Sequence, residues 1–136
     1  MTPADIDALI HAASMARDRA YAPYSGFRVG AALLAASGRV YTGCNIENAA
    51  FSPTICAERV ALGTAIASGE PPGAFTAIAI VADHDRPTSP CGVCRQMLFE
   101  LAPGARVIMA AAPEKGSARL EMMPEQLLPY GFRLDV

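Results

Sequence analysis

Lysine and long apolar runs are scarce in this sequence of 136 residues. Lysine occurs once, at Lys115, and the formal net charge is −2, which argues against a track of phosphate contacts along a nucleic acid. The longest apolar stretches, such as Ile78–Ala82, have the length of a strand and fall far short of the roughly 18 residues of a membrane span. Asp5 and Asp7 stand where a signal peptide needs basic and then apolar residues. We therefore expect a cytoplasmic protein with neither a nucleic acid nor a membrane as its partner.

Large apolar side chains are also fewer than the composition first suggests. Hydrophobic residues make up 52% of the chain, but 27 of these 71 residues are alanine. Charged residues make up 18%, and this balance excludes a disordered chain. The length predicts a single domain over residues 1–136. Its core must either bring small side chains into close contact or bury further surface against another subunit.

Hydrophobic periodicity, turn residues and helix caps predict an α/β fold. Thr2-Pro3 begins an amphipathic helix that we expect to reach about Ala20, and Ser37-Gly38 predicts a hairpin turn. The other expected elements are strands at Arg28–Ala36, Arg39–Asn45, Phe75–Ala82 and Arg106–Ala111, helices at Cys56–Ser68 and Cys91–Leu101, and a short strand and a short helix near Pro124–Leu128. Strand–helix–strand units favour parallel strands with right-handed crossovers. We expect a three-layer α/β/α sandwich with a mixed five-stranded sheet.

The cysteines gather where two of these helices begin. Without a secretion signal, clustered cysteines favour a metal site over disulfides. Cys56 precedes one helix, and the pair Cys91-x-x-Cys94 opens another. Ligands bind at the carboxyl ends of strands in such sheets, and helix N-termini favour thiolates. Three thiolates with one open position are typical of catalytic zinc, whereas four protein ligands are typical of a structural site.

A carboxyl group beside the first cysteine points to catalysis. Glu58 lies two residues after Cys56, close enough to exchange a proton with a water molecule that zinc activates. Three thiolates leave a net negative charge on the site, and Arg59 is the residue that we expect to offset it through a ligand sulfur.

Other interpretations of the cysteines remain open at this point. The pair Cys91-x-x-Cys94 also occurs in redox sites and in structural zinc sites. Cys44 is an additional thiol that would close a four-cysteine site, although a small buried side chain is the simpler interpretation. His11 and His84 are alternative fourth ligands, and we expect both to be solvated.

Several segments together resemble a known family. They are Tyr21–Ser25 with Val29–Ala32, Gly43–Ala49, Cys56–Arg59 and Ser89–Gln96. Cys-x-Glu followed by Pro-Cys-x-x-Cys is the signature of the zinc deaminases. The chain resembles cytidine deaminases of the short, homotetrameric, three-cysteine type, in the cytidine/deoxycytidylate deaminase superfamily, from about Ile6 to Phe132.

The resemblance implies a reaction and a catalytic centre. The reaction is the zinc-dependent hydrolytic deamination of cytidine and deoxycytidine to uridine and deoxyuridine with release of ammonia, a step of pyrimidine salvage. One zinc ion per chain would bind Cys56, Cys91 and Cys94. Glu58 would take a proton from the attacking water, protonate the ring nitrogen beside C4 and help the amine to leave.

The same resemblance implies a set of substrate contacts. Asn45 and Glu47 match residues that bind the ribose hydroxyls, and Phe27 matches the aromatic side chain that packs on the pyrimidine. The backbone N–H of Ala57 and the carbonyl of Ser89 match contacts to the edge of the base. Two further residues, Phe51 and Phe132, match aromatic positions around the site.

The resemblance also implies a difference at Phe51 and an oligomer. The family often has Tyr where this chain has Phe51, at a position that reaches a neighbouring subunit's site, so a hydrogen bond there is lost. The expected partner is a second copy of the chain, in a homotetramer whose sites neighbours complete.

The substrate class has alternatives. The segment Asn45–Phe51 carries no positive charge, which favours a nucleoside over a nucleotide. The alternatives are a zinc-dependent deaminase of another small aminated nucleoside-like compound, and a zinc-stabilised module without catalysis. Glu58 distinguishes an enzyme from the module without catalysis, because a structural zinc site does not need this carboxyl group.

Overall fold

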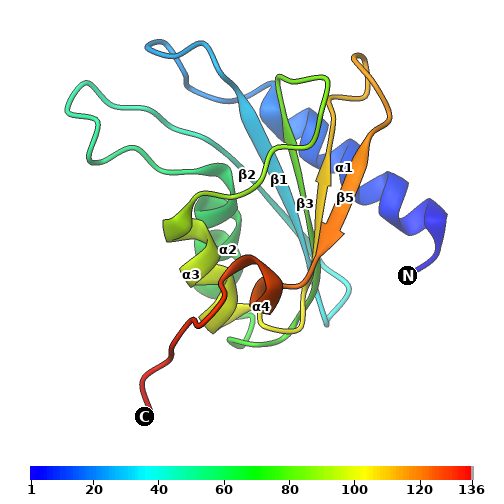
Figure 1. The fold of residues 1–136 in the computed structure, drawn as a ribbon, viewed down its shortest axis with the longest axis vertical. Coiled ribbons are helices and arrows are strands. Elements are labelled where there is room, and N and C mark those ends of the chain that lie inside the picture. Colours follow the sequence, from blue (N-terminus) through cyan, green and yellow to red (C-terminus); the bar gives the residue numbers. More distant parts are fainter. Residues whose placement is uncertain (136) are drawn as a thin grey trace.

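The computed structural model describes residues 1–135 and contains a mixed sheet with helices on both faces (Figure 1). The first helix, α1 (Pro3–Arg17), begins at the N-cap Thr2, whose side chain accepts a hydrogen bond from the N–H of Asp5. The predicted extension of this helix to about Ala20 is wrong. The backbone N–H groups of residues 18–20 bond to carbonyls three residues earlier, which tightens the turn and ends the helix at Arg17.

Five strands form the sheet in the order β2-β1-β3-β4-β5. The strands are β1 (Val29–Ala35), β2 (Val40–Cys44), β3 (Phe75–Ala82), β4 (Arg106–Ala110) and β5 (Arg119–Met122). β3 and β4 pair in parallel and the other neighbours pair antiparallel, which confirms the predicted mixed five-stranded sheet. The hairpin between β1 and β2 turns at Gly38, whose φ of 90° favours glycine.

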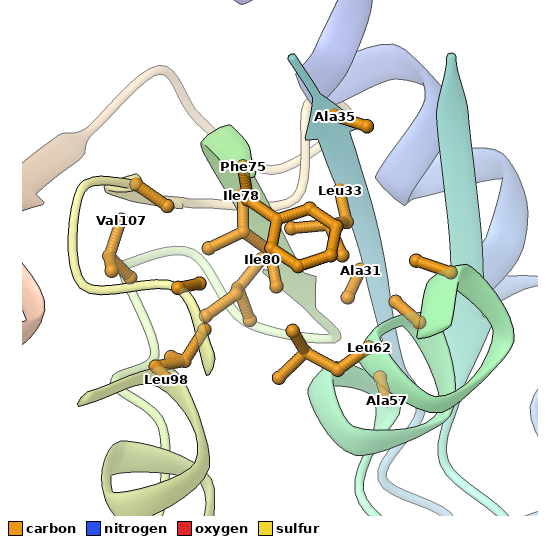
Figure 2. Close-up of a cluster of buried hydrophobic side chains, with 14 of the residues drawn as sticks. Ala31, Leu33, Ala35, Ala57, Leu62, Phe75, Ile78, Ile80, Leu98 and Val107 are labelled. Carbon is orange, nitrogen blue, oxygen red and sulfur yellow. The ribbon is translucent and has the colours of Figure 1, made fainter. Parts of the chain in front are cut away.

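Helix α1 covers one face of the sheet, and α2 (Ala57–Ala67) and α3 (Gly92–Leu101) cover the other, with the short helix α4 (Pro124–Leu127) beside α3 (Figure 1). This arrangement confirms the predicted α/β/α layers. The larger core cluster lies between the sheet and α2 and α3, where Ile78 and Ile80 of β3 face Leu62 and Leu98 (Figure 2).

Small residues bring the helices very close to the sheet. A Cβ atom added at Gly30 would lie 2.0 Å from the carbonyl oxygen of Ala13 in α1. One added at Gly43 would lie 2.4 Å from the carbonyl oxygen of Ala57 and 2.6 Å from the nitrogen of Ala61 in α2. Close contact of small side chains is therefore one use of the alanine-rich composition.

Both cysteine-bearing helices begin at the same end of the sheet, where the carboxyl ends of β2 and β3 lie. α2 follows the loop after β2, and α3 follows the loop after β3. No helix among residues 1–135 combines the length and apolar character that a membrane crossing requires.

Candidate active site

Three cysteine side chains meet at the starts of α2 and α3. The Sγ atoms of Cys56, Cys91 and Cys94 all lie within 4.8 Å of one another, and those of Cys56 and Cys91 are 3.8 Å apart. Thiolates bound at about 2.3 Å to a tetrahedral zinc ion lie roughly 3.8 Å from each other. The donor set and its spacing therefore fit a zinc ion with a fourth position left open.

The helix starts explain this convergence. Cys56 is the N-cap of α2 and Cys91 the N-cap of α3, both with extended backbone, and neither side chain is used to cap its helix. Cys94 is fully buried in the first turn of α3. The unpaired N–H groups and the positive end of each helix favour the thiolate form of such cysteines.

The fourth cysteine lies outside this cluster. Cys44 ends β2, where it pairs with Gly30 of β1. The metal-binding group found among residues 1–135 holds neither Cys44 nor a histidine, so nothing in the described chain closes the site with a fourth protein ligand. None of the four cysteines forms a disulfide in the described chain.

The thiols influence one another's pKa. A hydrogen bond from Cys94 lowers the pKa of the Cys56 thiol, and Arg59 adds to that effect. The same contact with Cys56, together with burial, raises the pKa of Cys94. Arg59 Nη2 lies 3.8 Å from Cys56 Sγ and donates a hydrogen bond of 3.3 Å to the carbonyl of Thr54. A fixed cation therefore touches the thiol cluster where we expected it.

Glu58 is the buried acid of the site. Its exposure is 4%, and burial raises the pKa of its carboxyl group. It lies in the first turn of α2 and lines the same pocket as Cys56 and Cys91. A buried carboxyl group beside a metal centre can hold and transfer protons.

The pocket over the cysteines has a volume of about 290 Å³. It brings together most of the residues singled out from the sequence, and five further residues, Ser25, Val29, Thr54, Ile80 and Thr88, also line it. The predicted residues that line it are Phe27, Asn45, Glu47, Cys56, Ala57, Glu58, Ser89 and Cys91. Ser25 and Val29 lie in segments that carry the family resemblance, but serine, valine, threonine and isoleucine occur throughout the chain, so no sequence signal gave any of the five a role in the pocket.

Asn45 and Glu47 already hold the wall of this pocket. Asn45 Oδ1 accepts a 2.8 Å hydrogen bond from the N–H of Val29, and its Nδ2 donates one of 2.8 Å to the carbonyl of Phe27. Glu47 accepts hydrogen bonds from the N–H groups of Tyr24 and Ser25, at 2.9 and 3.1 Å, and from the Ser25 hydroxyl. The Ser25 hydroxyl is the main cause of a lowered pKa at the Glu47 carboxyl.

Two predicted aromatic residues do not line this pocket. Phe51 is 70% exposed, with a φ of 60°, and stands edge-on to Tyr24 at a ring-centroid distance of 6.1 Å. It borders a neighbouring hollow of about 310 Å³ that Ser25, Glu47 and Thr54 also line. Phe132 is 68% exposed, and its carbonyl accepts a hydrogen bond from Gln96 of α3.

A sheet flanked by helices, with three thiols and a buried carboxyl group at two helix starts, defines a zinc-dependent α/β enzyme. The family described as the cytidine and deoxycytidylate deaminase zinc-binding region matches residues 3–111. The chain belongs to this family. The family description and the cysteine cluster agree on zinc as the cofactor, at one ion per chain.

Individual relatives agree with this assignment. A cytidine deaminase of Halalkalibacterium halodurans is 52% identical over 131 residues, which are 96% of each chain. The crystal structure of cytidine deaminase from Burkholderia pseudomallei has a TM-score of 0.88 and 45% identity, over 97% of this chain and 100% of that one. That from Mycobacterium tuberculosis has a TM-score of 0.78 and 35% identity, over 96% and 98%.

Proposed function

We propose that this protein is a cytidine deaminase, which hydrolyses cytidine and deoxycytidine to uridine and deoxyuridine and releases ammonia. The observation that carries the proposal is the pocket that joins the cysteine cluster and Glu58 to Asn45 and Glu47. Metal chemistry and polar groups suited to a sugar thus face one cavity. A relative with 52% identity over nearly the whole chain is named a cytidine deaminase, which supports the same reaction.

The three cysteines would hold the cofactor. Cys56, Cys91 and Cys94 are the proposed zinc ligands, because their sulfur atoms have the spacing of a tetrahedral site. When bound, zinc supplies Lewis-acid activation of water in its open position. Three thiolates and one zinc ion would give the site a net negative charge. Arg59 would offset that charge through its contact with Cys56.

Glu58 is the proposed proton carrier. Its carboxylate takes a proton from the attacking water, whose oxygen forms a bond to C4 of the pyrimidine. Glu58 then gives that proton to the ring nitrogen beside C4. The hydroxyl group now on C4 gives up its own proton, which Glu58 passes to the amine as the C4–N bond breaks, so that C4 becomes a carbonyl and ammonia leaves. The burial of Glu58 keeps bulk water away from these transfers.

The remaining pocket residues would orient the nucleoside. Phe27 offers an apolar ring to the base, and the backbone N–H of Ala57 and the carbonyl of Ser89 offer a donor and an acceptor to its edge. Asn45 retains a second amide hydrogen, and the Glu47 carboxylate has further lone pairs for ribose hydroxyls. We propose these roles as the substrate contacts of the site.

Charge supports a nucleoside as the substrate. Among residues 1–135 no Lys or Arg lines the pocket, and a 5′-phosphate would need such a partner. The test is a spectrophotometric assay with cytidine, deoxycytidine, cytosine and CMP side by side. We expect turnover of both nucleosides and little of cytosine or CMP. Absence of turnover with either nucleoside, in protein that carries about one zinc ion per chain, would overturn the proposal.

We also propose that the working enzyme is a homotetramer of single-domain subunits over residues 1–136, completed at each site by a neighbour. The exposed rings of Tyr24 and Phe51 beside the pocket support contact with another subunit. The unpaired cysteines suit the reducing cytoplasm, where pyrimidine salvage would take place. Light scattering tests the assembly, and an active monomer would contradict it.

A further inference from the structure

One wall of the pocket lacks backbone support. Thr88 and Ser89 line the pocket in the loop that leads from β3 to Cys91. In the described chain, residues 86–90 neither donate nor accept a backbone–backbone hydrogen bond. Two prolines, Pro87 and Pro90, remove two of the donors that such bonds would need. Something other than the backbone must therefore fix this wall.

The side chain of Arg95 makes that connection. Its Nε donates a 2.8 Å hydrogen bond to the carbonyl of Pro90, and its Nη2 donates one of 3.1 Å to the hydroxyl of Ser89. Its Nη1 donates a third, of 2.9 Å, to the carbonyl of Leu127 in α4. Three nitrogens of one guanidinium group thus bind three acceptors on two segments.

The position of Arg95 makes these bonds a rigid link. Arg95 is half-buried on α3 and does not itself line the pocket, whereas Pro90, whose carbonyl it holds, is buried. A planar guanidinium group fixes the direction of each bond, which a flexible lysine does not. A buried carbonyl without a partner is costly, so the contact to Pro90 stabilises a single orientation of the peptide before Cys91.

We propose that Arg95 is a positioning residue for the nucleoside: it holds residues 88–90 so that the Ser89 wall fits the base. The proposal rests on the proposed function and adds a residue to it. Arg95 acts through Ser89 and Pro90 and touches no reacting atom. Its loss therefore weakens the binding of substrate and product alike, which raises KM more than it lowers kcat.

The test compares Arg95→Met and Arg95→Lys with the wild type, all at equal zinc content. The control is Arg106→Met, which removes an arginine at the start of β4. Arg106 pairs with Glu121, and its neighbour on the adjacent strand β3 is Ala77. Calorimetry measures the dissociation constant of uridine, the product of the proposed reaction, and steady-state kinetics with cytidine give KM and kcat. For Arg95→Met we expect the dissociation constant of uridine and the KM for cytidine each to rise about tenfold. We expect a smaller rise for Arg95→Lys and none for Arg106→Met.

The outcomes separate this proposal from the function itself. Suppose that the wild type binds uridine and deaminates cytidine, while Arg95→Met changes the uridine dissociation constant and KM less than threefold. This result would overturn the proposed role of Arg95 and leave the proposed function intact. Loss of thermal stability without a change in uridine affinity would overturn it too, because the residue would then only attach α4. If Arg95→Met does not fold, Arg95→Lys decides by the same threefold limit. A wild type without cytidine turnover would instead refute the proposed function.

Discussion

Two walls of the pocket, besides the one at Ser89, are built in different ways. The helix wall, formed by Cys56, Glu58 and Cys91, lies at the starts of two helices whose following turns pack into the main core. The loop wall, formed by residues 24–27 and 45–54, is largely exposed and is held by side chains that bond to backbone groups. The difference separates the proposed chemistry, which needs fixed geometry, from the proposed substrate contacts on loops.

The two walls should respond differently to mutation. A change in the helix wall should remove chemistry or disturb the core, because its residues are positioned by packing. A change in the loop wall should affect stability and nucleoside affinity together, because Asn45 and Glu47 bond to the loops and are also the proposed ribose contacts. Variants in each wall test that division.

Glu58→Gln should have the largest effect on catalysis. The substitution keeps the shape of the side chain and removes its capacity to exchange protons, and general acid–base groups contribute about 10²–10⁴-fold to rates. We expect kcat to fall by that factor while elemental analysis still finds one zinc ion per chain. The control is Glu100→Gln, an exposed change on α3. A near-normal kcat for Glu58→Gln would refute its role as proton carrier.

Gly43→Ala tests whether packing positions the helix wall. The added Cβ would meet the backbone of α2 at Ala57 and Ala61 at 2.4 and 2.6 Å, so the helix must move. Overpacking of this kind costs about 1–3 kcal/mol, and we expect denaturation curves to show that loss together with reduced kcat.

The matched control for this change is Gly63→Ala, within α2 itself. A Cβ at Gly63 meets nothing within 4 Å, and alanine favours a helix over glycine by about 1 kcal/mol. Gly63→Ala should therefore stabilise the protein. Equal stability and activity for the two variants would show that contact between β2 and α2 does not position Glu58.

Sequence reasoning predicted the helix wall better than the loop wall. The Cys91-x-x-Cys94 pair and the helix starts beside Cys56 and Cys91 are local features, so the cluster was predicted. The strand patterns are local too, and they predicted the five-stranded sheet. The bonds of Asn45 to Val29 and Phe27 lie at the open end of the β1–β2 hairpin, and they depend on the direction of the Asn45 side chain, which the strand pattern does not give.

Arg95 shows the same limit. Arg95 stands in the sequence directly after Cys94. Its two partners Ser89 and Leu127 are far apart in the sequence, and one side chain can reach both only because α3 and α4 pack together. The early end of α1, at Arg17 instead of about Ala20, was missed because the turn after it has a helical composition.

Asn45→Ala should have an intermediate effect, on stability first. It removes the acceptor of the Val29 N–H and the donor to the Phe27 carbonyl, and a lost pair of such bonds costs about 1–3 kcal/mol. We expect that decrease in the free energy of unfolding, a raised KM for cytidine and an unchanged zinc content.

Asn48→Ala is the control for Asn45→Ala. Asn48 is exposed and accepts a single local hydrogen bond, from the N–H of Ala50. The control should change the free energy of unfolding by no more than about 0.5 kcal/mol. If Asn45→Ala loses affinity without losing stability, the loop wall does not depend on Asn45, and the contrast between the walls fails there.

Phe51→Tyr should have the smallest effect and examines the outermost part of the loop wall. The ring is 70% exposed and already stands edge-on to Tyr24, so the new hydroxyl group can point into solvent without breaking that contact. Because the backbone and the ring are kept, we expect the free energy of unfolding to stay within about 0.5 kcal/mol of the wild type. KM should change less than threefold if Phe51 contributes only apolar packing at the proposed subunit contact. A tenfold change in KM, measured beside the unaltered tetramer by light scattering, would mean that a hydroxyl group at this position reaches a substrate and that the chemistry of the loop wall extends to Phe51.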